Sequence, residues 1–418
     1  MANNAPAEGT TAHDRHATWM ELFFDLVAVA GISQLTHLLH RGPSLGEFAL
    51  YLVLYLAFWT AWACITLYSD VARDHTHQGL MLAAMLGLGL MAAAVAGVPD
   101  RHSTTFAAVY VVLRLCTAQI WGRGRIVVDW PVAQLTVGVL PWIVSLWVGE
   151  PGKYWWWAVG LTIDLYLMFA VSGERMLAQA QQKLDWRLSR SHRFDGIEVP
   201  KIKAVHADPE HFGERLGLYV IIVLGEGVIA VIDAVGAEAW TARVLVLGFG
   251  SFAILAGLWA LTLLFGAIPR LMSGVDPGSG VPWQHIMATH CGVTGAIATV
   301  AAGLGMTIAH ADGHVTTGIG WVLYGGAAAY FAITGMSGLR SGADWRSILG
   351  YPLPCMLIAV GLGFFAVHLG PIGAVYGVLV LIVWSLLWQT YTDGKWRTGT
   401  GPARPHRPSR DEPGAAEA

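Results

Sequence analysis

Long apolar stretches separated by short polar ones run through most of the chain. A helix needs about 20 apolar residues to cross the hydrocarbon core of a bilayer, and twelve stretches approach that length between Gly, Pro and charged residues. The pattern therefore predicts an all-α fold, a polytopic membrane helical bundle. The predicted spans are residues 19–40, 46–68, 79–98, 103–121, 131–149, 154–173, 214–234, 243–268, 285–310, 316–336, 352–369 and 371–392.

The predicted spans fall into two sets of six on either side of one long polar stretch. Residues 174–193, the first part of that stretch, fit either an amphipathic helix at the membrane surface or a solvated extension of the sixth span. The Pro-rich end of the chain is typical of disorder. We expect a polar N-terminus at 1–18, a first half at 19–173, a linker at 174–213, a second half at 214–392 and a disordered tail at 393–418.

Two sets of six spans suggest an internal repeat. Aligning Glu21 with Glu214 superposes the two halves, and an even number of spans in each gives repeats of the same orientation. Beyond that residue the polar positions differ, since Asp25 falls opposite Leu218. A 6+6 parallel repeat and a chance equality of helix number both remain open.

Composition and charge agree with a protein whose main partner is a lipid bilayer. Of the 418 residues, 55% are hydrophobic and 13% are charged, against roughly a quarter charged in soluble domains. The basic residues form no stripe of the kind that binds nucleic acid. Most of the 25 Lys and Arg residues fall on the side of the amino terminus, which places both termini in the cytoplasm; the exceptions outside the predicted spans are Arg41, Arg101, Lys153 and Arg243.

Cysteine and histidine spacing predicts neither a metal site nor a cofactor. The four cysteines all lie in apolar stretches, where free Cys behaves as a small hydrophobe. No pair of them has the spacing of a zinc site or the loop placement of a disulfide framework. We expect reduced packing residues.

Acidic residues open the first predicted span. Glu21 and Asp25 are four residues apart, so they project from one helical face. Glu21 also fits a first-turn carboxylate stabilised by the helix dipole. Arg114 in the fourth span needs an anion, and by depth Asp25 or Glu21 reaches its level. This pair would be a substrate or proton site, or an ion pair that only fixes helix register; otherwise Arg114 extends to the cytoplasmic interface.

The seventh predicted span carries charge at its start and in its middle. Glu214 and Arg215 lie at the start, and Glu226 lies about 18 Å further along the helix axis, close to the bilayer midplane. Loss of hydration favours the protonated form of such a carboxyl group, which is the property that a proton-coupled transporter requires. A neutral, hydrogen-bonded Glu that only stabilises a helix contact fits the sequence as well. Asp164, near mid-depth in the sixth span, is a further candidate, whereas His290 is more typical of a core histidine.

Two motifs resemble the most characteristic stretches of a known family. Residues 16–34 contain E-L-F-F-D-L-V, and residues 211–227 contain E-R-L-G-L-Y-V-I-I-V-L-G-E. With Val-Leu-Arg at 112–114, they make the chain similar to the bacterial low temperature requirement A (LtrA) family over about residues 15–395. The resemblance implies a bacterial inner-membrane protein with many spans, but no reaction or substrate. Gly227 stands where the family often has Ser. The signature positions that the resemblance implies are Glu21, Asp25, Arg114, Glu214, Arg215 and Glu226.

Three classes of function are compatible with these patterns. A proton- or ion-linked transporter of an unknown small molecule or ion is favoured by twelve spans and by intramembrane carboxylates. An enzyme acting on a lipid or isoprenoid would need the acids Asp25, Asp164 and Glu226 to converge on an apolar cavity. A scaffold or sensor would use its ion pairs only to hold helices together. The sequence does not indicate an oligomeric state.

Overall fold

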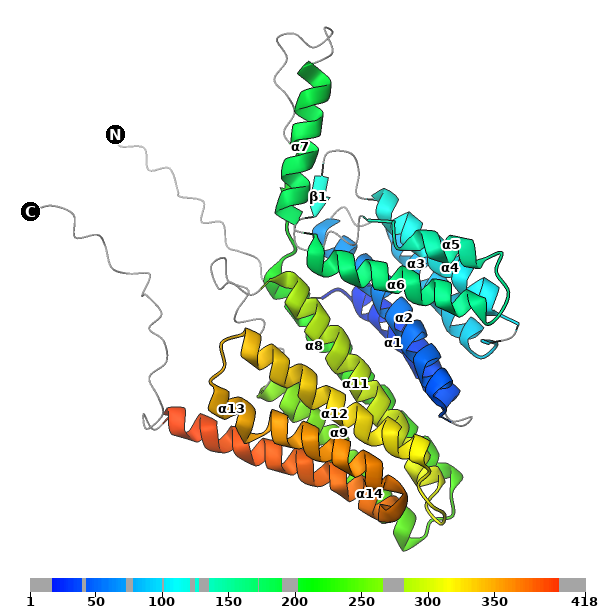
Figure 1. Ribbon diagram of the computed structural model, residues 1–418, viewed down its shortest axis with the longest axis vertical. Coiled ribbons are helices and arrows are strands. Elements are labelled where there is room, and N and C mark those ends of the chain that lie inside the picture. Colours follow the sequence, from blue (N-terminus) through cyan, green and yellow to red (C-terminus); the bar gives the residue numbers. More distant parts are fainter. Residues whose placement is uncertain are drawn as a thin grey trace, which may run out of the picture.

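The structure is a bundle of long helices (Figure 1). It is a computed structural model that describes residues 17–39, 43–72, 78–99, 101–120, 125–127, 135–171, 173–189, 202–265 and 282–397. The elements of the amino-terminal part are α1 (Trp19–Leu39), α2 (Leu45–Ala72), α3 (Gln78–Val95), α4 (Ser103–Ile120), β1 (Arg125–Val127), α5 (Val139–Ser145), α6 (Gly152–Ala170), α7 (Gly173–Ser189) and β2 (Lys203–Val205). Those of the carboxy-terminal part are α8 (Pro209–Ala237), α9 (Ala242–Trp259), a π-helical turn η4 (Ala260–Leu264), α11 (Trp283–Ala309), α12 (Thr317–Arg340), α13 (Trp345–Gly350) and α14 (Pro352–Arg397).

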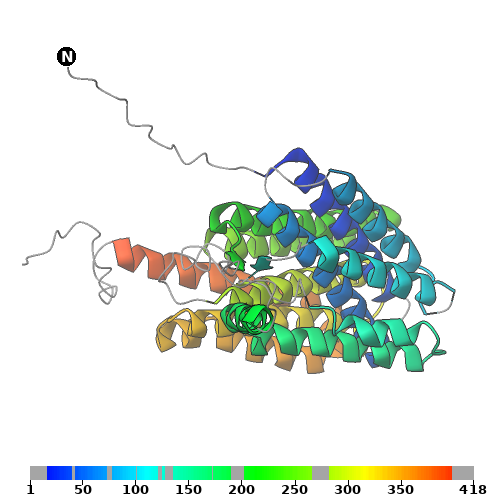
Figure 2. The same ribbon diagram turned by 90° about the horizontal axis from the view of Figure 1, so that it is seen from above.

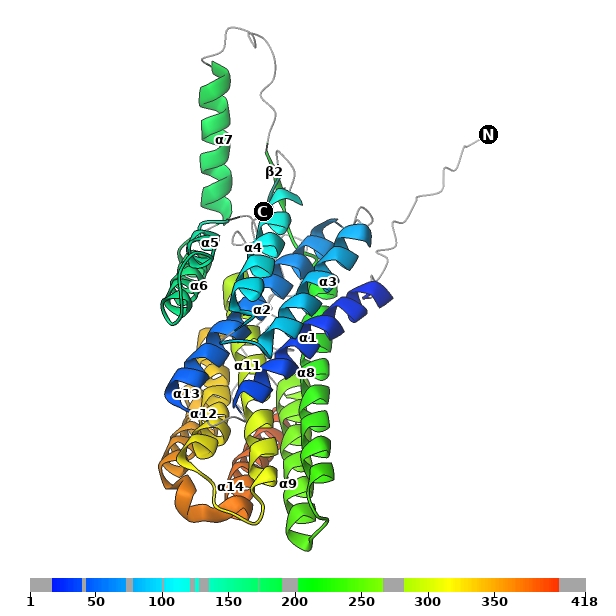
Figure 3. The same cartoon turned by 90° about the vertical axis from the view of Figure 1, so that its right-hand side faces the viewer.

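The helices form two groups that meet along α1, α2, α8 and α11. Helices α1 to α6 form one group and α8 to α14 the other, as Figures 1 and 3 show. Close packing inside the second group depends on small residues, because a Cβ on Gly303 of α11 would collide with the backbone of Leu323 on α12. Small residues let helix backbones approach closely where no polar contact drives association. The fold class predicted from hydropathy, an all-α membrane helical bundle, is confirmed.

Helix α14 folds back on itself at Gly370. This residue has a φ of 63°, in the left-handed region that glycine adopts without strain, and Pro371 follows it. The two limbs lie against each other, since the Cys355 thiol contacts Ser385 Oγ at 3.5 Å, and the indole of Trp384 on the second limb donates to the carbonyl of Gly350 in α13 at 3.0 Å. The predicted break between residues 369 and 371 therefore lies at the turn of a helical hairpin.

The fifth predicted span, residues 131–149, is wrong as a continuous helix. Helix α5 has only seven residues, and residues 135–138 before it are not helical. A physical reason lies in Arg114, whose guanidinium takes the carbonyl of Leu135 as a hydrogen-bond acceptor at 3.3 Å. Residues 131–134 lie outside the described part of the chain.

The stretch between the halves contains a helix and two short strands. Helix α7 begins shortly after α6 and is bent away from it by 86°. It projects from the bundle in Figure 1 and is seen end-on in Figure 2. Strands β1 and β2 pair in parallel beside it, with Arg125 opposite Lys203. The polar N-terminus predicted at 1–18 and the tail predicted at 393–418 fall almost wholly outside the described residues.

Eight helical stretches of the described chain are long and apolar enough to cross a membrane, or nine if the bent pair α6 and α7 is one span. One of them, residues 345–392, contains the hairpin of α14. Residues 103–118 of α4 form a shorter apolar helix, and α5 has only seven residues. A multi-pass membrane protein is therefore established, while twelve crossings and a 6+6 repeat stay predictions.

Candidate functional site

Arg215 of α8 is fully buried and joins the two groups of helices. Its Nη2 donates to Asp25 Oδ1 at 2.6 Å and its Nε donates to Asp25 Oδ2 at 3.4 Å, so one edge of the guanidinium binds both oxygens of the carboxylate of α1. Its Nη1 donates to Ser69 Oγ of α2 at 2.6 Å and lies 3.6 Å from Glu21 Oε1. Such forked, charge-assisted contacts fix both the position and the orientation of the paired groups.

His211 lies one turn before Arg215 on the same face of α8. Its Nδ1 is 2.6 Å from Asp70 Oδ1, near the end of α2. Its Nε2 is 3.4 Å from Glu21 Oε2, close enough for an ionic contact but not aligned as a hydrogen bond. Both ring nitrogens therefore face carboxylates. Two carboxylates facing one imidazole favour its protonated form, so this position is suited to holding a proton.

We call Glu21, Asp25, Asp70, His211 and Arg215 the three-helix cluster, because α1, α2 and α8 contribute its members. Helix starts position several of them. Thr18 and Glu21 form a capping box at the start of α1, with Thr18 N donating to Glu21 Oε2 at 2.9 Å and Glu21 N donating to Thr18 Oγ1 at 3.3 Å. Asp208 caps α8 through the backbone amides of Glu210 and His211. The first-turn role expected of Glu21 is thus present alongside its contacts with His211 and Arg215.

Polar contacts continue from the cluster toward the middle of α11. The indole of Trp62 donates to Asp25 Oδ1 at 2.7 Å, and its ring stacks on His290 with centroids 5.4 Å apart. His290 in turn accepts from the indole of Trp59 at Nδ1, at 3.3 Å, and donates from Nε2 to the carbonyl of Leu216, at 3.2 Å. The imidazole of His290 is therefore neutral with both nitrogens satisfied, as expected for a core histidine.

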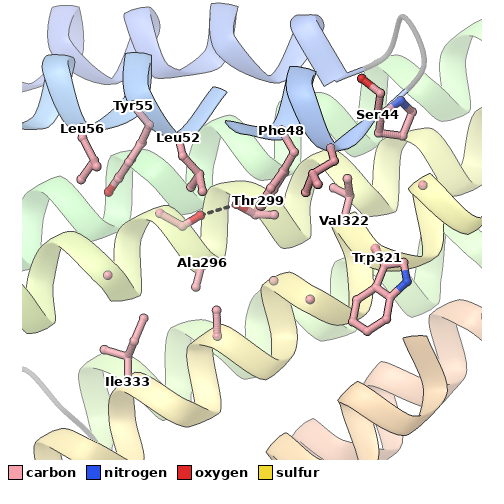
Figure 4. A pocket seen from close by; sticks show the side chains of 18 of the residues that line it. Ser44, Phe48, Leu52, Tyr55, Leu56, Ala296, Thr299, Trp321, Val322 and Ile333 are labelled. Carbon is pink, nitrogen blue, oxygen red and sulfur yellow. Dashed lines mark hydrogen bonds between the residues drawn. The ribbon is translucent and has the colours of Figure 1, made fainter. Parts of the chain in front are cut away.

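The chain of polar groups ends at a cavity between α2, α11 and α12 (Figure 4). The hydroxyl of Tyr55 on α2 lies 2.7 Å from the carbonyl of Cys291 and 2.7 Å from Thr294 Oγ1. Both of these residues follow His290 on α11. Tyr55 and Cys291 also line the cavity, which has a volume of about 750 Å³. Buried groups thus connect the three-helix cluster to the cavity along the seam between the two helix groups.

Arg114 and Asp164 form a second, separate ion pair. Arg114 Nη2 on α4 lies 3.2 Å from both carboxylate oxygens of Asp164 on α6, and Nη1 donates to the thiol of Cys64. Both side chains are buried. The expected pairing of Arg114 with Asp25 or Glu21 is wrong, because Arg215 is the partner of Asp25 and the neighbour of Glu21. Depth had placed these groups at similar levels but could not show which helices are adjacent.

Glu214 and Glu226 are the two remaining acidic candidates on α8. Glu214 is half-buried and accepts a hydrogen bond from the backbone amide of Ala17 at 3.1 Å. Glu226 is half-buried between the exposed Gly225 and the buried Gly227. Among the described residues, no hydrogen bond or ion pair joins Glu226 to another side chain. The structure therefore does not bring Glu226 into the three-helix cluster.

Sequence reasoning missed two members of the three-helix cluster, His211 and Asp70. His211 had the features of a helix-boundary residue, yet it stands four residues before Arg215, a spacing that puts both on one helical face. Asp70 closes a long apolar stretch and shows no such signal. Within the described ranges, no three His, Cys, Asp or Glu side chains converge as they do around a metal ion.

Comparison with known proteins agrees with the motifs. The family model described as bacterial low temperature requirement A protein (LtrA) matches residues 16–389, which include every member of the three-helix cluster and the pair of Arg114 and Asp164. No curated protein and no solved structure matches the chain. Since the family match covers most of the chain, the protein belongs to the bacterial low temperature requirement A (LtrA) family.

Proposed function

We propose that this protein is a proton-linked transporter and that the three-helix cluster carries the coupling proton. The observation that carries the proposal is a line of buried side chains, in which His211 contacts Glu21, Arg215 joins Glu21 to Asp25, and Trp62 and His290 extend from Asp25 toward the cavity. Ionisable residues inside a membrane are costly and tend to mark ion or proton pathways. This line follows the seam between the two helix groups, where an alternating-access transporter has its substrate and ion sites.

Coupling would follow from competition between a proton and Arg215 for the carboxylate of Asp25. In the observed state, Arg215 neutralises the Asp25 carboxylate through two hydrogen bonds. A proton delivered through His211 and taken up by Asp25 would remove the charge that holds Arg215. The contact between α1 and α8 would then weaken, which lets the helix groups move relative to each other. Proton binding would in this way be linked to opening of the seam.

The enzyme alternative has less support. An intramembrane acid catalyst needs its carboxyl group at the cavity that holds the substrate. Asp25 lies in the three-helix cluster, Asp164 is paired with Arg114 in the first helix group, and Glu226 is half-buried on α8. None of these three lines the cavity. The acids that would have to converge are thus distributed over separate places.

Proton movement tests the proposal directly. The full chain is reconstituted in liposomes that contain a pH-sensitive dye, and a potassium diffusion potential set with valinomycin drives protons inward. We expect proton uptake above that of protein-free liposomes, and we expect Asp25→Asn and His211→Gln to reduce it to that background. Asp312→Asn is the matched control, because Asp312 is an exposed aspartate whose side chain is 78% accessible in its surface pair with Arg243.

The same series of variants includes controls for correct folding. Asp25→Asn leaves Arg215 buried with less charge compensation, so the variant must elute as one monodisperse species before its uptake counts. Asp25→Glu keeps the carboxylate and should retain part of the uptake. Equal uptake by wild type and a well-folded Asp25→Asn variant would refute the coupling role of the cluster.

A further inference from the structure

The cavity between α2, α11 and α12 has the size of a small-molecule site. Its volume of about 750 Å³ lies within the range of roughly 300–1,000 Å³ that is usual for such sites. Side chains from α2 point into it, toward α11 and α12, in Figure 4. We propose that it binds a neutral, single-chain amphiphile with a hydroxyl head group, that is, a long-chain or isoprenoid alcohol. As the identification of a transported substrate, this inference rests on the proposed function.

The apolar part of the ligand follows from the walls. The wall formed by α11 and α12 includes the small residues Gly295, Ala296 and Gly325, and the facing wall of α2 contributes Phe48 and Leu52. Small residues opposite large apolar ones leave a slot suited to a hydrocarbon chain.

The slot is accessible from the outer surface of the bundle. Leu45 and Leu52, which line it, are 86% and 41% exposed. Where the helices cross a bilayer, such an opening faces the acyl chains, so a hydrophobic molecule can enter sideways. At the end formed by the starts of α2 and α12, the carbonyl of Pro43 lies so close to Gly318 that a Cβ there would collide with it. The ligand therefore enters along the side of the slot.

The absence of charge from the lining excludes an ionic head group. Among the described residues, those that line the cavity include no Asp, Glu, Lys, Arg or His. A charged group would have to be buried there without a partner, which is far more costly than burying a neutral polar group. Fatty acids and phospholipid head groups are therefore poor ligands for the inner part of the cavity.

The hydroxyl head group follows from the donors and acceptors that remain. Thr299 Oγ1 donates to the carbonyl of Gly295 at 2.7 Å, and the hydroxyl of Tyr51 lies 3.3 Å from it. Tyr55 has a single hydrogen, which is used on Cys291 or Thr294. A hydroxyl whose hydrogen is already donated offers only lone pairs. Because Tyr55 and Thr299 line the cavity as acceptors, a head group bound beside these two side chains supplies the donor, as an alcohol does.

Photolabelling tests the site without relying on transport. The probe is a long-chain primary alcohol with a diazirine in its chain, applied to the full protein in detergent, and labelled residues are identified by mass spectrometry. We expect labelling of residues that line the slot. The unlabelled alcohol should compete about fivefold better than its methyl ether, the ratio expected for one net hydrogen bond, and better than the corresponding carboxylate.

Two variants make the test specific. Gly325→Phe should abolish labelling of the slot, since a Cβ on Gly325 meets only the Trp321 ring, at 3.8 Å, and a larger side chain would extend into the cavity. Gly361→Phe is the matched control, because Gly361 has no neighbour within 4 Å and lies outside the lining. Tyr55→Phe should preserve labelling but reduce the preference for alcohol over ether.

The outcomes separate this inference from the proposed function. Equal competition by alcohol, ether and carboxylate, or full labelling of the slot in Gly325→Phe, would overturn the alcohol site. If Gly325→Phe does not fold, loss of the alcohol preference in Tyr55→Phe still decides the point. Alcohol-selective labelling without proton uptake in liposomes would support the site and overturn the transporter. Proton uptake without alcohol selectivity would overturn only the inference on the substrate.

Discussion

Removing the negative charge of Asp164 should destabilise the protein strongly while leaving its shape nearly unchanged. Asp164→Asn is almost isosteric, but it leaves the guanidinium of Arg114, which is 2% exposed, without a counter-charge. The remaining contacts are the Cys64 thiol and the Leu135 carbonyl, and Arg114 Nε has no hydrogen-bond partner in the described structure. Breaking a buried pair in this way costs about 3–5 kcal/mol. Because the loss comes from one uncompensated charge, removing both charges should reverse it.

Thermal unfolding of the detergent-purified protein, followed by tryptophan fluorescence, measures the effect. At about 2 °C per kcal/mol, the low end of the usual range for larger domains, Asp164→Asn should lower the Tm by roughly 6–10 °C. The double variant Arg114→Met with Asp164→Leu removes both charges and keeps apolar volume, so it should unfold near the wild-type temperature or above it.

Two results would refute this reasoning about the pair. An unchanged Tm in Asp164→Asn would mean that Arg114 is hydrated or has another anion. A double variant as unstable as the single one would mean that the pair contributes more than charge compensation. If instead the double variant is stable and proton uptake in liposomes is retained, the pair has a structural role alone.

Two further predictions concern the packing around Asp164 and the orientation of the protein in the membrane. Gly138→Ala should lower stability by about 1–3 kcal/mol in the same unfolding assay, since a Cβ there would collide with the carboxylate of Asp164; a Tm within error of wild type would contradict that contact. A cysteine that replaces the exposed Asp312, between α11 and α12, should react with a membrane-impermeant maleimide on intact cells. A cysteine that replaces the exposed Asp185 of α7 should react only after the cells are permeabilised. The reverse pattern would contradict the orientation predicted from loop charge.

Hydropathy predicted where the helices lie better than which helices touch. Spans such as 19–40 and 285–310 correspond closely to α1 and α11, because burial in lipid demands a long apolar stretch regardless of its neighbours. The predicted span at 131–149 is instead the short helix α5, preceded by a backbone carbonyl that Arg114 uses. That contact depends on α4 lying beside α5, and no local pattern encodes it.

The candidate residues show the same limit. Depth along a helix, at 1.5 Å per residue, placed Asp25 and Arg114 at comparable levels, yet each is paired elsewhere. The pairing of Asp25 with Arg215 requires α1 to lie against α8, a contact between elements about 190 residues apart in the chain. Spacing of four residues could have joined His211 to Arg215, since that inference needs only one helix.

The two ion pairs differ in what movement each would permit. Arg114 and Asp164 connect α4 to α6 inside the first helix group, so a rearrangement between the groups leaves them intact. Asp25 and Arg215 connect α1 to α8 across the seam, so the same rearrangement must break or transfer their contact. A buried pair that has to be broken during a functional cycle needs a substitute for the lost charge, and His211, between Glu21 and Asp70, is placed to supply a proton. In the proposed transport cycle, the cluster across the seam is therefore the site that links protonation to conformation, whereas the pair within the first group stays intact.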